Sequence, residues 1–185
     1  MDKKQLEESR KFITNLIQNK KIKTSIVGES KFFLEKSHHS IETASRLLEL
    51  IEEENLNAQM WVINASYYSM FFAVTALLAK KNKKIDSEIG IHKATFHAFI
   101  YYFYDKIKEN YIENYKEAIE ESEELLNFSE NSTNNLFDNY NFELNKRRNF
   151  TYFMGQIAET SKAKTSLKRA KEFLIKIEEI YEAFN

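Results

Sequence analysis

Residues Met60–Ala79 read MWVINASYYSMFFAVTALLA, twenty positions without a charge in a chain of which 30% is charged. Apolar residues would lie on nearly every side of a helix formed by this stretch. Such a helix is buried on all faces, in a protein core or in a bilayer. Its length would span a membrane, but no second span follows and small polar side chains interrupt it: Asn64, Ser66, Ser69 and Thr75. We therefore expect the central helix of a core.

The composition favours one helical domain over residues 1–185. The chain has no proline and three glycines, so few residues would break a helix. It has no cysteine, which excludes disulfides, thiolate zinc sites and cysteine catalysis. A net charge of −1 gives no general attraction to nucleic acid. The N-terminal residues are too charged for a signal peptide and the uncharged stretch is expected to be a core helix, so we expect a cytoplasmic protein without a membrane partner.

Apolar spacing predicts an all-α, up-and-down bundle of four to five long helices. The first covers residues 3–20, and 21–29 is a link to a helix over 30–54 with Ser30 as its N-cap. Another covers 91–110, after a basic loop over 81–90. The last, residues 157–184, has apolar residues alternating by four and three, the seam of near-parallel packing: Ala163, Leu167, Ala170, Leu174, Ile177, Tyr181 and Phe184.

The segment between these helices is acidic and then rich in asparagine. Residues 113–130 contain seven glutamates and one lysine, with a thin apolar stripe. This segment is either a marginal surface helix or an acidic flap, and we interpret it as a solvated face. Residues 131–145 are expected to begin as a loop.

The sequence contains no motif for a metal or a cofactor. Neither glycine-rich phosphate loop is present, and there is no HExxH pair. His92 and His97 are five residues apart and would not share a helical face. His38 and His39 lie in a charged stretch and are expected to be solvated. We predict no metal site and no cofactor.

Two groups of residues are candidates for binding. Lys146–Tyr152, KRRNFTY, places cations beside aromatic residues and could bind phosphate and stack on a base through Arg147, Arg148, Asn149 and Tyr152. Its other interpretation is surface charge at a helix start, although cations oppose the helix dipole there. In the central helix, Asn64, Tyr68 and Thr75 share one stripe. We predict that Asn64 and Tyr68 face Arg147–Tyr152 across a common cleft.

These residues resemble those of the small stand-alone HEPN proteins. ASYYSMF at residues 65–71, followed by ALL at 76–78, resembles the YYAMF…ALL helix of that family. His92 resembles the histidine that opens its next helix, and Arg147–Tyr152 resembles its R…ADY segment. The similarity covers residues 30–182, with about 113–140 resembling an insertion, and residues 1–29 form an additional helix and link.

The resemblance implies a helical homodimer that works on nucleotides or RNA, often beside a minimal nucleotidyltransferase in toxin–antitoxin or defence pairs. The ribonuclease branch uses an R-x4-6-H motif, but no histidine follows Arg147 or Arg148, and Tyr152 takes its place. Tyrosine, with a pKa near ~10, is a poor base at neutral pH. We therefore expect a binding module for nucleotide, RNA or a partner protein. The alternatives are a metal-independent ribonuclease toxin using Arg147 or Arg148 with Asn149 and Tyr152, and a protein-interaction subunit docking through 113–130.

Overall fold

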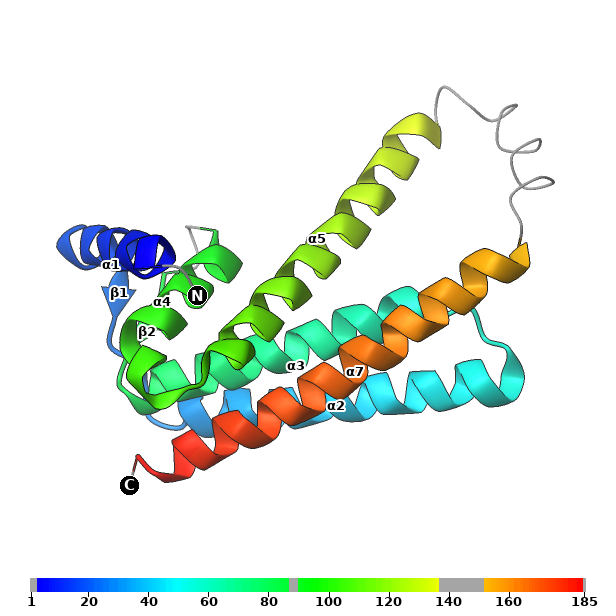
Figure 1. Cartoon of the computed structure of the whole chain (residues 1–185). Coiled ribbons are helices and arrows are strands. Elements are labelled where there is room, and N and C mark those ends of the chain that lie inside the picture. Colours follow the sequence, from blue (N-terminus) through cyan, green and yellow to red (C-terminus); the bar gives the residue numbers. More distant parts are fainter. Residues whose placement is uncertain (1–2, 87–89, 137–151, 185) are drawn as a thin grey trace.

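The central helix of the sequence is α3 (Gln59–Lys80), and other helices cover it on several sides (Figure 1). The computed structural model describes residues 3–86, 90–136 and 152–184, with side chains for 4–86, 90–123 and 160–184. Fourteen of the residues of α3 are buried, including Val62, Met70, Val74 and Leu77. Among the described residues, α3 is the one helix long and apolar enough to cross a membrane, and 72% of its most apolar window is buried within the protein.

Helix α2 (Glu29–Glu54) runs antiparallel to α3 and forms a hairpin with it (Figure 1). The helix begins after Gly28, whose φ of 86° lies in the left-handed region that glycine adopts without strain. The prediction of Ser30 as the N-cap is therefore wrong. The Ser30 hydroxyl instead donates a 2.6 Å hydrogen bond to the Tyr181 hydroxyl. The helix ends at Asn55, which also adopts a left-handed conformation.

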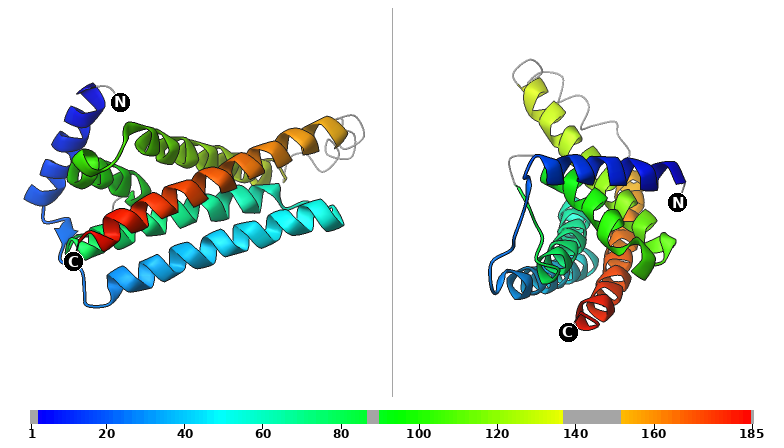
Figure 2. Two further views of the ribbon diagram at one scale, coloured as in Figure 1. Left: turned by 60° about the horizontal axis from the view of Figure 1, so that its bottom comes forward. Right: turned by 90° about the vertical axis from the view of Figure 1, so that its left-hand side faces the viewer.

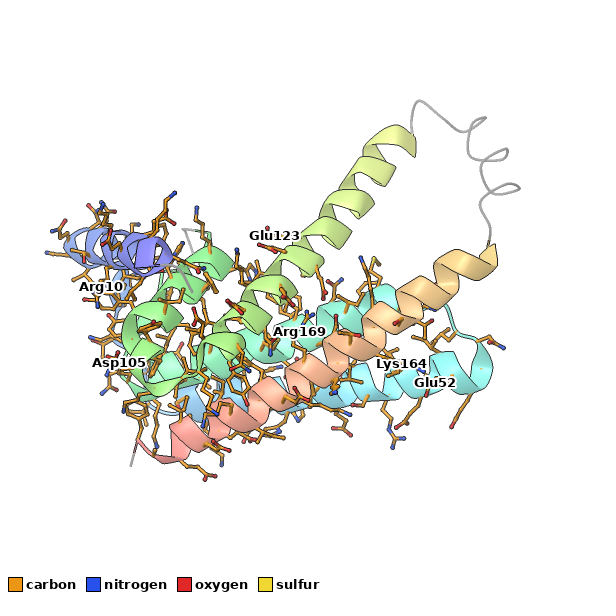
Figure 3. The ribbon with its side chains drawn as sticks, in the orientation of Figure 1. Arg10, Glu52, Asp105, Glu123, Lys164 and Arg169 are labelled. Carbon is orange, nitrogen blue, oxygen red and sulfur yellow. The ribbon has the colours of Figure 1, made fainter. Side chains whose placement is uncertain are left out.

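Helix α7 (Tyr152–Glu182) lies along α3 and also touches α2 (Figure 2). It starts five residues before the predicted 157. The predicted seam is confirmed, since Ala163, Leu167, Ala170, Leu174 and Ile177 are all buried. The same face contributes Phe173, which is fully buried. At the surface, Lys164 forms a 2.6 Å ion pair with Glu52 of α2 (Figure 3).

The predicted helix over 91–110 is shorter than expected. Helix α4 (Ile91–Phe103) passes into a 3-10 turn, η1 (Tyr104–Lys106), and α5 (Glu109–Leu136) begins three residues later. Residues 113–130 belong to α5, so the helical alternative is confirmed and the flap is wrong. Their buried positions include Tyr115, Ala118 and Ser122, which with the preceding Ile112 pack one side of α5 against the core. Residues 131–136 are helical, where a loop was predicted.

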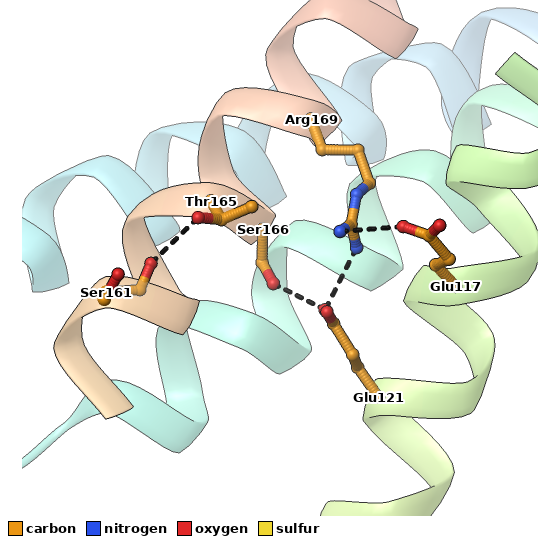
Figure 4. A network of polar contacts seen from close by, with 6 residues as sticks. All are labelled: Glu117, Glu121, Ser161, Thr165, Ser166 and Arg169. Carbon is orange, nitrogen blue, oxygen red and sulfur yellow. Dashed lines mark hydrogen bonds and ion pairs between the residues drawn. The ribbon is translucent and has the colours of Figure 1, made fainter. Parts of the chain in front are cut away.

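Polar contacts fasten α5 to α7 and α3. Arg169, with 12% of its side chain exposed, lies 3.0 Å from Glu117 and 3.1 Å from Glu121 (Figure 4). The Ser166 hydroxyl donates a 2.7 Å hydrogen bond to the same Glu121 carboxylate. Beyond these contacts α5 diverges from α7 (Figure 1).

Helix α1 (Lys3–Gln18) packs mainly on α4 at one end of the molecule (Figure 2). Its buried residues are Ser9, Ile13 and Leu16. The link that follows contains β1 (Ile22–Lys23), which pairs antiparallel with β2 (Lys84–Ile85). The sequence does not predict this two-residue ladder. The expectation of an all-α chain is confirmed, because helices account for nearly all the described residues.

Candidate functional site

A long groove runs between α2 and α3 on the face of the hairpin that α7 leaves open. Its volume is about 940 Å³. Helix α3 lines it with Trp61, Asn64, Ala65, Tyr68 and Phe72, and α2 lines it with Phe32, Lys36, His39, Ser40, Thr43 and Leu47. The groove is the largest of the described cavities and mostly apolar, as ligand sites in proteins commonly are.

Three aromatic side chains of the groove are open to solvent. Trp61 is 59% exposed, Phe32 52% and Tyr68 39%. Trp61, Ala65, Tyr68 and Phe72 recur at steps of four and three, so they form one stripe along α3. The stripe lies along the groove, facing α2. Exposed aromatic residues gathered in a groove indicate an interaction site.

The rim of the groove carries basic side chains. Lys36 and His39 are exposed at its rim, and no carboxylate is among the residues that line it. The Lys36 ammonium lies 5.4 Å above the centre of the Phe32 ring. The Ser40 and Thr43 hydroxyls donate to carbonyls of their own helix, so each keeps only its acceptor capacity for a ligand. An anion with a flat apolar part fits this combination.

Behind Tyr68 lies a hydrogen-bonded pair that connects α3 to α4. The Tyr67 hydroxyl is 2.5 Å from Nδ1 of His92, which sits in the first turn of α4. Burial raises the pKa of Tyr67, with the neighbouring Tyr68 and Glu123 acting in the same direction, so Tyr67 stays a phenol at neutral pH. Burial lowers the pKa of His92, although Glu123 opposes the shift. A neutral imidazole that accepts from Tyr67 at Nδ1 carries its hydrogen on Nε2.

Asn64 is held in place by a hydrogen bond from α5. Its Oδ1 accepts a 3.0 Å hydrogen bond from the hydroxyl of Ser122 on α5. Tyr68 in turn contacts the groove residue Phe72 at 5.8 Å and His92 at 6.0 Å between ring centroids. Asn64 and Tyr68 thus line the groove and also contact other helices, Asn64 through Ser122 of α5 and Tyr68 through His92 of α4.

The predicted site residues are described only in part. Asn64 and Tyr68 do line one groove, whereas the predicted third member of their stripe, Thr75, bonds to the Phe71 carbonyl of its own helix. Arg147, Arg148 and Asn149 lie outside the described residues. Tyr152 is the first residue of α7, and its side chain is likewise outside the description. The predicted cleft between Asn64, Tyr68 and Arg147–Tyr152 therefore stays a prediction.

One hydrogen bond connects the start of α3 to the early part of α7. The Gln59 side-chain amide at the start of α3 donates a 3.2 Å hydrogen bond to the Thr160 hydroxyl of α7. Thr160 follows Tyr152 by eight residues and Gln59 precedes Asn64 by five. The starts of α3 and α7 thus lie at the same end of the hairpin, which is compatible with a shared cleft there.

The sequence interpretation missed the groove's most exposed ring, Trp61, and its basic rim. Trp61 lies inside the uncharged stretch, where an apolar helix gives no sign of which flank lacks a partner. Lys36 and His39 lie on a charged surface and have no motif around them. The resemblance points to His92 as the histidine that opens its helix. In the structure, His92 forms a hydrogen bond with Tyr67. His38 is not merely solvated, since its Nε2 lies 2.8 Å from Glu178.

No group of three or more histidine or acidic residues among the described positions could hold a metal ion. No family model matches the chain, and comparisons with curated proteins and with solved structures likewise give no match.

Proposed function

We propose that the protein is a HEPN-like binding module that holds a nucleotide or a short single strand of RNA in the groove between α2 and α3. The observation that carries the proposal is the stripe of solvent-exposed rings, Trp61 and Tyr68, beside the basic side chains of Lys36 and His39. Aromatic rings stack on bases of any sequence, and a cation next to them attracts the phosphate. The lack of a carboxylate along the groove favours an anionic ligand.

In this proposal each side chain has one task. Trp61 and Tyr68 stack on successive bases, and Lys36 neutralises phosphate charge at the rim. Asn64 offers an amide N–H₂ group to a base edge, because its Oδ1 is already occupied by Ser122. The Arg147–Tyr152 segment is proposed to extend the phosphate-binding surface beyond the groove.

The proposal makes the protein a binder rather than a standard HEPN ribonuclease. The histidine of the R-x4-6-H motif is absent from the sequence. His92 is engaged by Tyr67, and its lowered pKa favours a neutral ring. A homodimer and a minimal nucleotidyltransferase partner, in a toxin–antitoxin or defence pair, belong to the same proposal and come from the resemblance. Sedimentation of the purified chain, alone and with such a partner, tests them.

The single tryptophan of the chain reports directly on the groove. We expect a short labelled RNA, or a nucleotide, to quench Trp61 fluorescence as it binds. Tyr68→Ala is expected to weaken binding about tenfold, since base stacking contributes about 1–3 kcal/mol per base. Trp61→Ala, followed by anisotropy of the labelled RNA, should do the same. Lys36→Glu should weaken binding and flatten its dependence on salt.

Ile175→Ala is the matched control, because Ile175 is 60% exposed on α7, away from the groove. It should leave the affinity unchanged. The proposal is wrong if Trp61→Ala and Tyr68→Ala bind RNA and nucleotides as the wild type does. Incubation with the metal chelated and recovery of the RNA separates binding from cleavage. Cleavage that Arg147→Ala/Arg148→Ala abolishes would establish the ribonuclease alternative instead.

A further inference from the structure

The β1–β2 ladder joins two lysine-rich segments that are far apart in sequence. The first segment has Lys20 and Lys21 before β1 and Lys23 within it. The second begins with Lys80 at the end of α3, continues with Lys81 and Lys83 in the connection, and ends with Lys84 in β2. The register pairs Lys23 with Lys84. Seven lysines therefore lie at one end of the bundle, which faces the viewer in the right-hand part of Figure 2.

Some of these lysines have a structural role. Lys84 forms a 2.5 Å ion pair with Glu29, and Lys23 lies 3.1 Å from Asp86. Both carboxylates are nearly buried, so their lysines neutralise charge that the fold has taken from water. Lys84 and Lys23 are therefore accounted for by the packing of the ladder.

Three others of the seven, together with Lys106 of η1, rest on aromatic rings instead. No carboxylate of the described residues forms an ion pair with them, and each ammonium lies 4.0 to 6.0 Å from a ring centroid. These ring-seated lysines are Lys80 over Tyr181, Lys81 over Tyr102, Phe103 and Phe184, Lys83 over Tyr102, and Lys106 over Phe184. A cation–π contact orients an ammonium without cancelling its charge. The ring-seated lysines thus keep their positive charge while the rings orient them.

Beside these lysines stands a loop with two exposed aliphatic residues. Ile26 is 69% exposed and Val27 is fully exposed. The loop is held at both ends: the Ile26 backbone N–H donates to Glu29 at 3.1 Å, and the Ser25 hydroxyl donates to the Ala79 carbonyl at 2.9 Å. Because Ala79 adjoins Lys80, the aliphatic tip is held next to the first of the ring-seated lysines.

We propose that this end of the bundle binds an anionic lipid surface, with Ile26 and Val27 entering between the headgroups and the ring-seated lysines contacting their phosphates. Aliphatic side chains gain free energy on leaving water for the acyl boundary. Lysines near an anionic leaflet add electrostatic attraction. Neither contribution alone makes a stable anchor, but the structure places both on one side of the molecule.

The details favour a lipid surface over nucleic acid. Binding of single strands requires rings with an open face for the bases, and an ammonium group lies over each ring that seats a lysine. The most exposed apolar side chains of the loop, Ile26 and Val27, are aliphatic and have no π face. The site is also separate from the groove of the proposed function, since none of its residues lines that groove. The proposal concerns adsorption to a membrane surface. The expectation of no membrane partner concerned a helix that crosses the membrane.

The test is co-sedimentation of the full chain with vesicles. We expect binding to phosphatidylcholine vesicles that contain about one third phosphatidylglycerol, little binding to phosphatidylcholine alone, and weaker binding as salt is raised. Lys81→Glu/Lys83→Glu should lower the partition coefficient by about tenfold or more, since each lysine contributes about 1 kcal/mol near such a surface. Ile26→Ser/Val27→Ser should lower it by about tenfold while keeping its dependence on salt.

Lys168→Glu/Lys171→Glu is the matched control, because it makes the same change in net charge on exposed positions of α7. It should retain vesicle binding. The proposal fails if the wild type does not sediment with the anionic vesicles, or if the control loses as much binding as Lys81→Glu/Lys83→Glu. It also fails if that variant loses RNA binding and keeps vesicle binding. The vesicle results do not bear on Trp61 and Tyr68, so the groove is tested separately, by the RNA affinity of the Trp61 and Tyr68 variants.

Discussion

The Tyr67 hydroxyl and His92 Nδ1 lie 2.5 Å apart, so the central helix and the first turn of α4 share a hydrogen bond at the edge of the core. Tyr67 is 4% exposed and His92 is half-buried. Because the Tyr67 hydroxyl is buried, it depends on His92 for a hydrogen-bond partner. This contact fixes where α4 begins relative to the groove residue Tyr68.

Removing that hydroxyl should destabilise the fold. We expect Tyr67→Phe to lower the free energy of unfolding by about 1–3 kcal/mol, because it leaves a half-buried imidazole nitrogen without its partner. Urea denaturation measures the change. Tyr68→Phe is the control, since no hydrogen bond of the Tyr68 hydroxyl occurs among the described residues, and it should change stability by less than about 0.5 kcal/mol. Equal effects of the two variants would contradict the role of the pair.

Arg169 should be more important to stability than neighbouring surface charges. Arg169→Met removes the cation between Glu117 and Glu121, and Glu121 is only 25% exposed. We expect a loss of about 1–3 kcal/mol, less than for a fully buried pair because both carboxylates keep some contact with water. Lys168→Met, one residue earlier and 79% exposed, should lose less than about 0.5 kcal/mol. Thermal unfolding of both variants tests this difference.

Phe173 should be among the most costly truncations in the protein. Its ring is fully buried, and its centroid lies 5.8 Å from that of Phe99 and 5.5 Å from that of Tyr115. Phe173→Ala should lower the free energy of unfolding by about 3–5 kcal/mol, because the cavity left behind cannot close completely. Ile175→Ala, at an exposed position two residues later, should change it little. A small effect at Phe173 would mean that α7 does not pack as described.

Acidification should weaken the fold through its buried histidines. Burial lowers the pKa of His97, helped by the charge of Lys93 and opposed by Glu8, and burial also lowers the pKa of His92. The unfolded chain then binds more protons, so stability rises with pH and is lost as pH falls through about 6.5, the unfolded value. Urea midpoints measured from about pH 8 to about pH 5.5 should therefore decrease.

His97→Gln should lessen that decrease, because glutamine does not titrate and can still bond to Ser9, which lies 2.9 Å from His97 Nδ1. A variant whose stability profile runs parallel to that of the wild type would rule out His97 as a source of the pH dependence.

The spacing of apolar residues along the chain predicts the main helices of the fold. The uncharged stretch of α3 and the apolar seam of α7 are confirmed, because burial requires apolar residues at those spacings whatever the partner helix is. The breaks between helices were less predictable. No glycine or proline lies between Gly90 and Gly155, so neither the end of α4 at Phe103 nor the continuation of α5 to Leu136 has a marker in the sequence. Ser30 could cap a helix, but its bond to Tyr181 depends on tertiary packing.

The site was less accessible to sequence analysis than the fold. Asn64 and Tyr68 could be recognised as polar groups on an apolar helix. Trp61 could not be recognised as exposed, because exposure depends on where α2 and α7 leave a gap. The ring-seated lysines depend on a two-residue ladder, which is too short to leave a periodic pattern.

The ladder also bears on the order in which the chain folds. Lys23 and Lys84 are about 60 residues apart, and closing so long a loop in an unfolded chain is entropically costly. The antiparallel hairpin of α2 and α3 occupies most of that interval, and its contacts can form progressively from the short link between the two helices. Once the hairpin has formed, only the short segments at its open end remain to be joined. The ladder is therefore expected to form late, and substitutions within it should speed unfolding more than they slow folding.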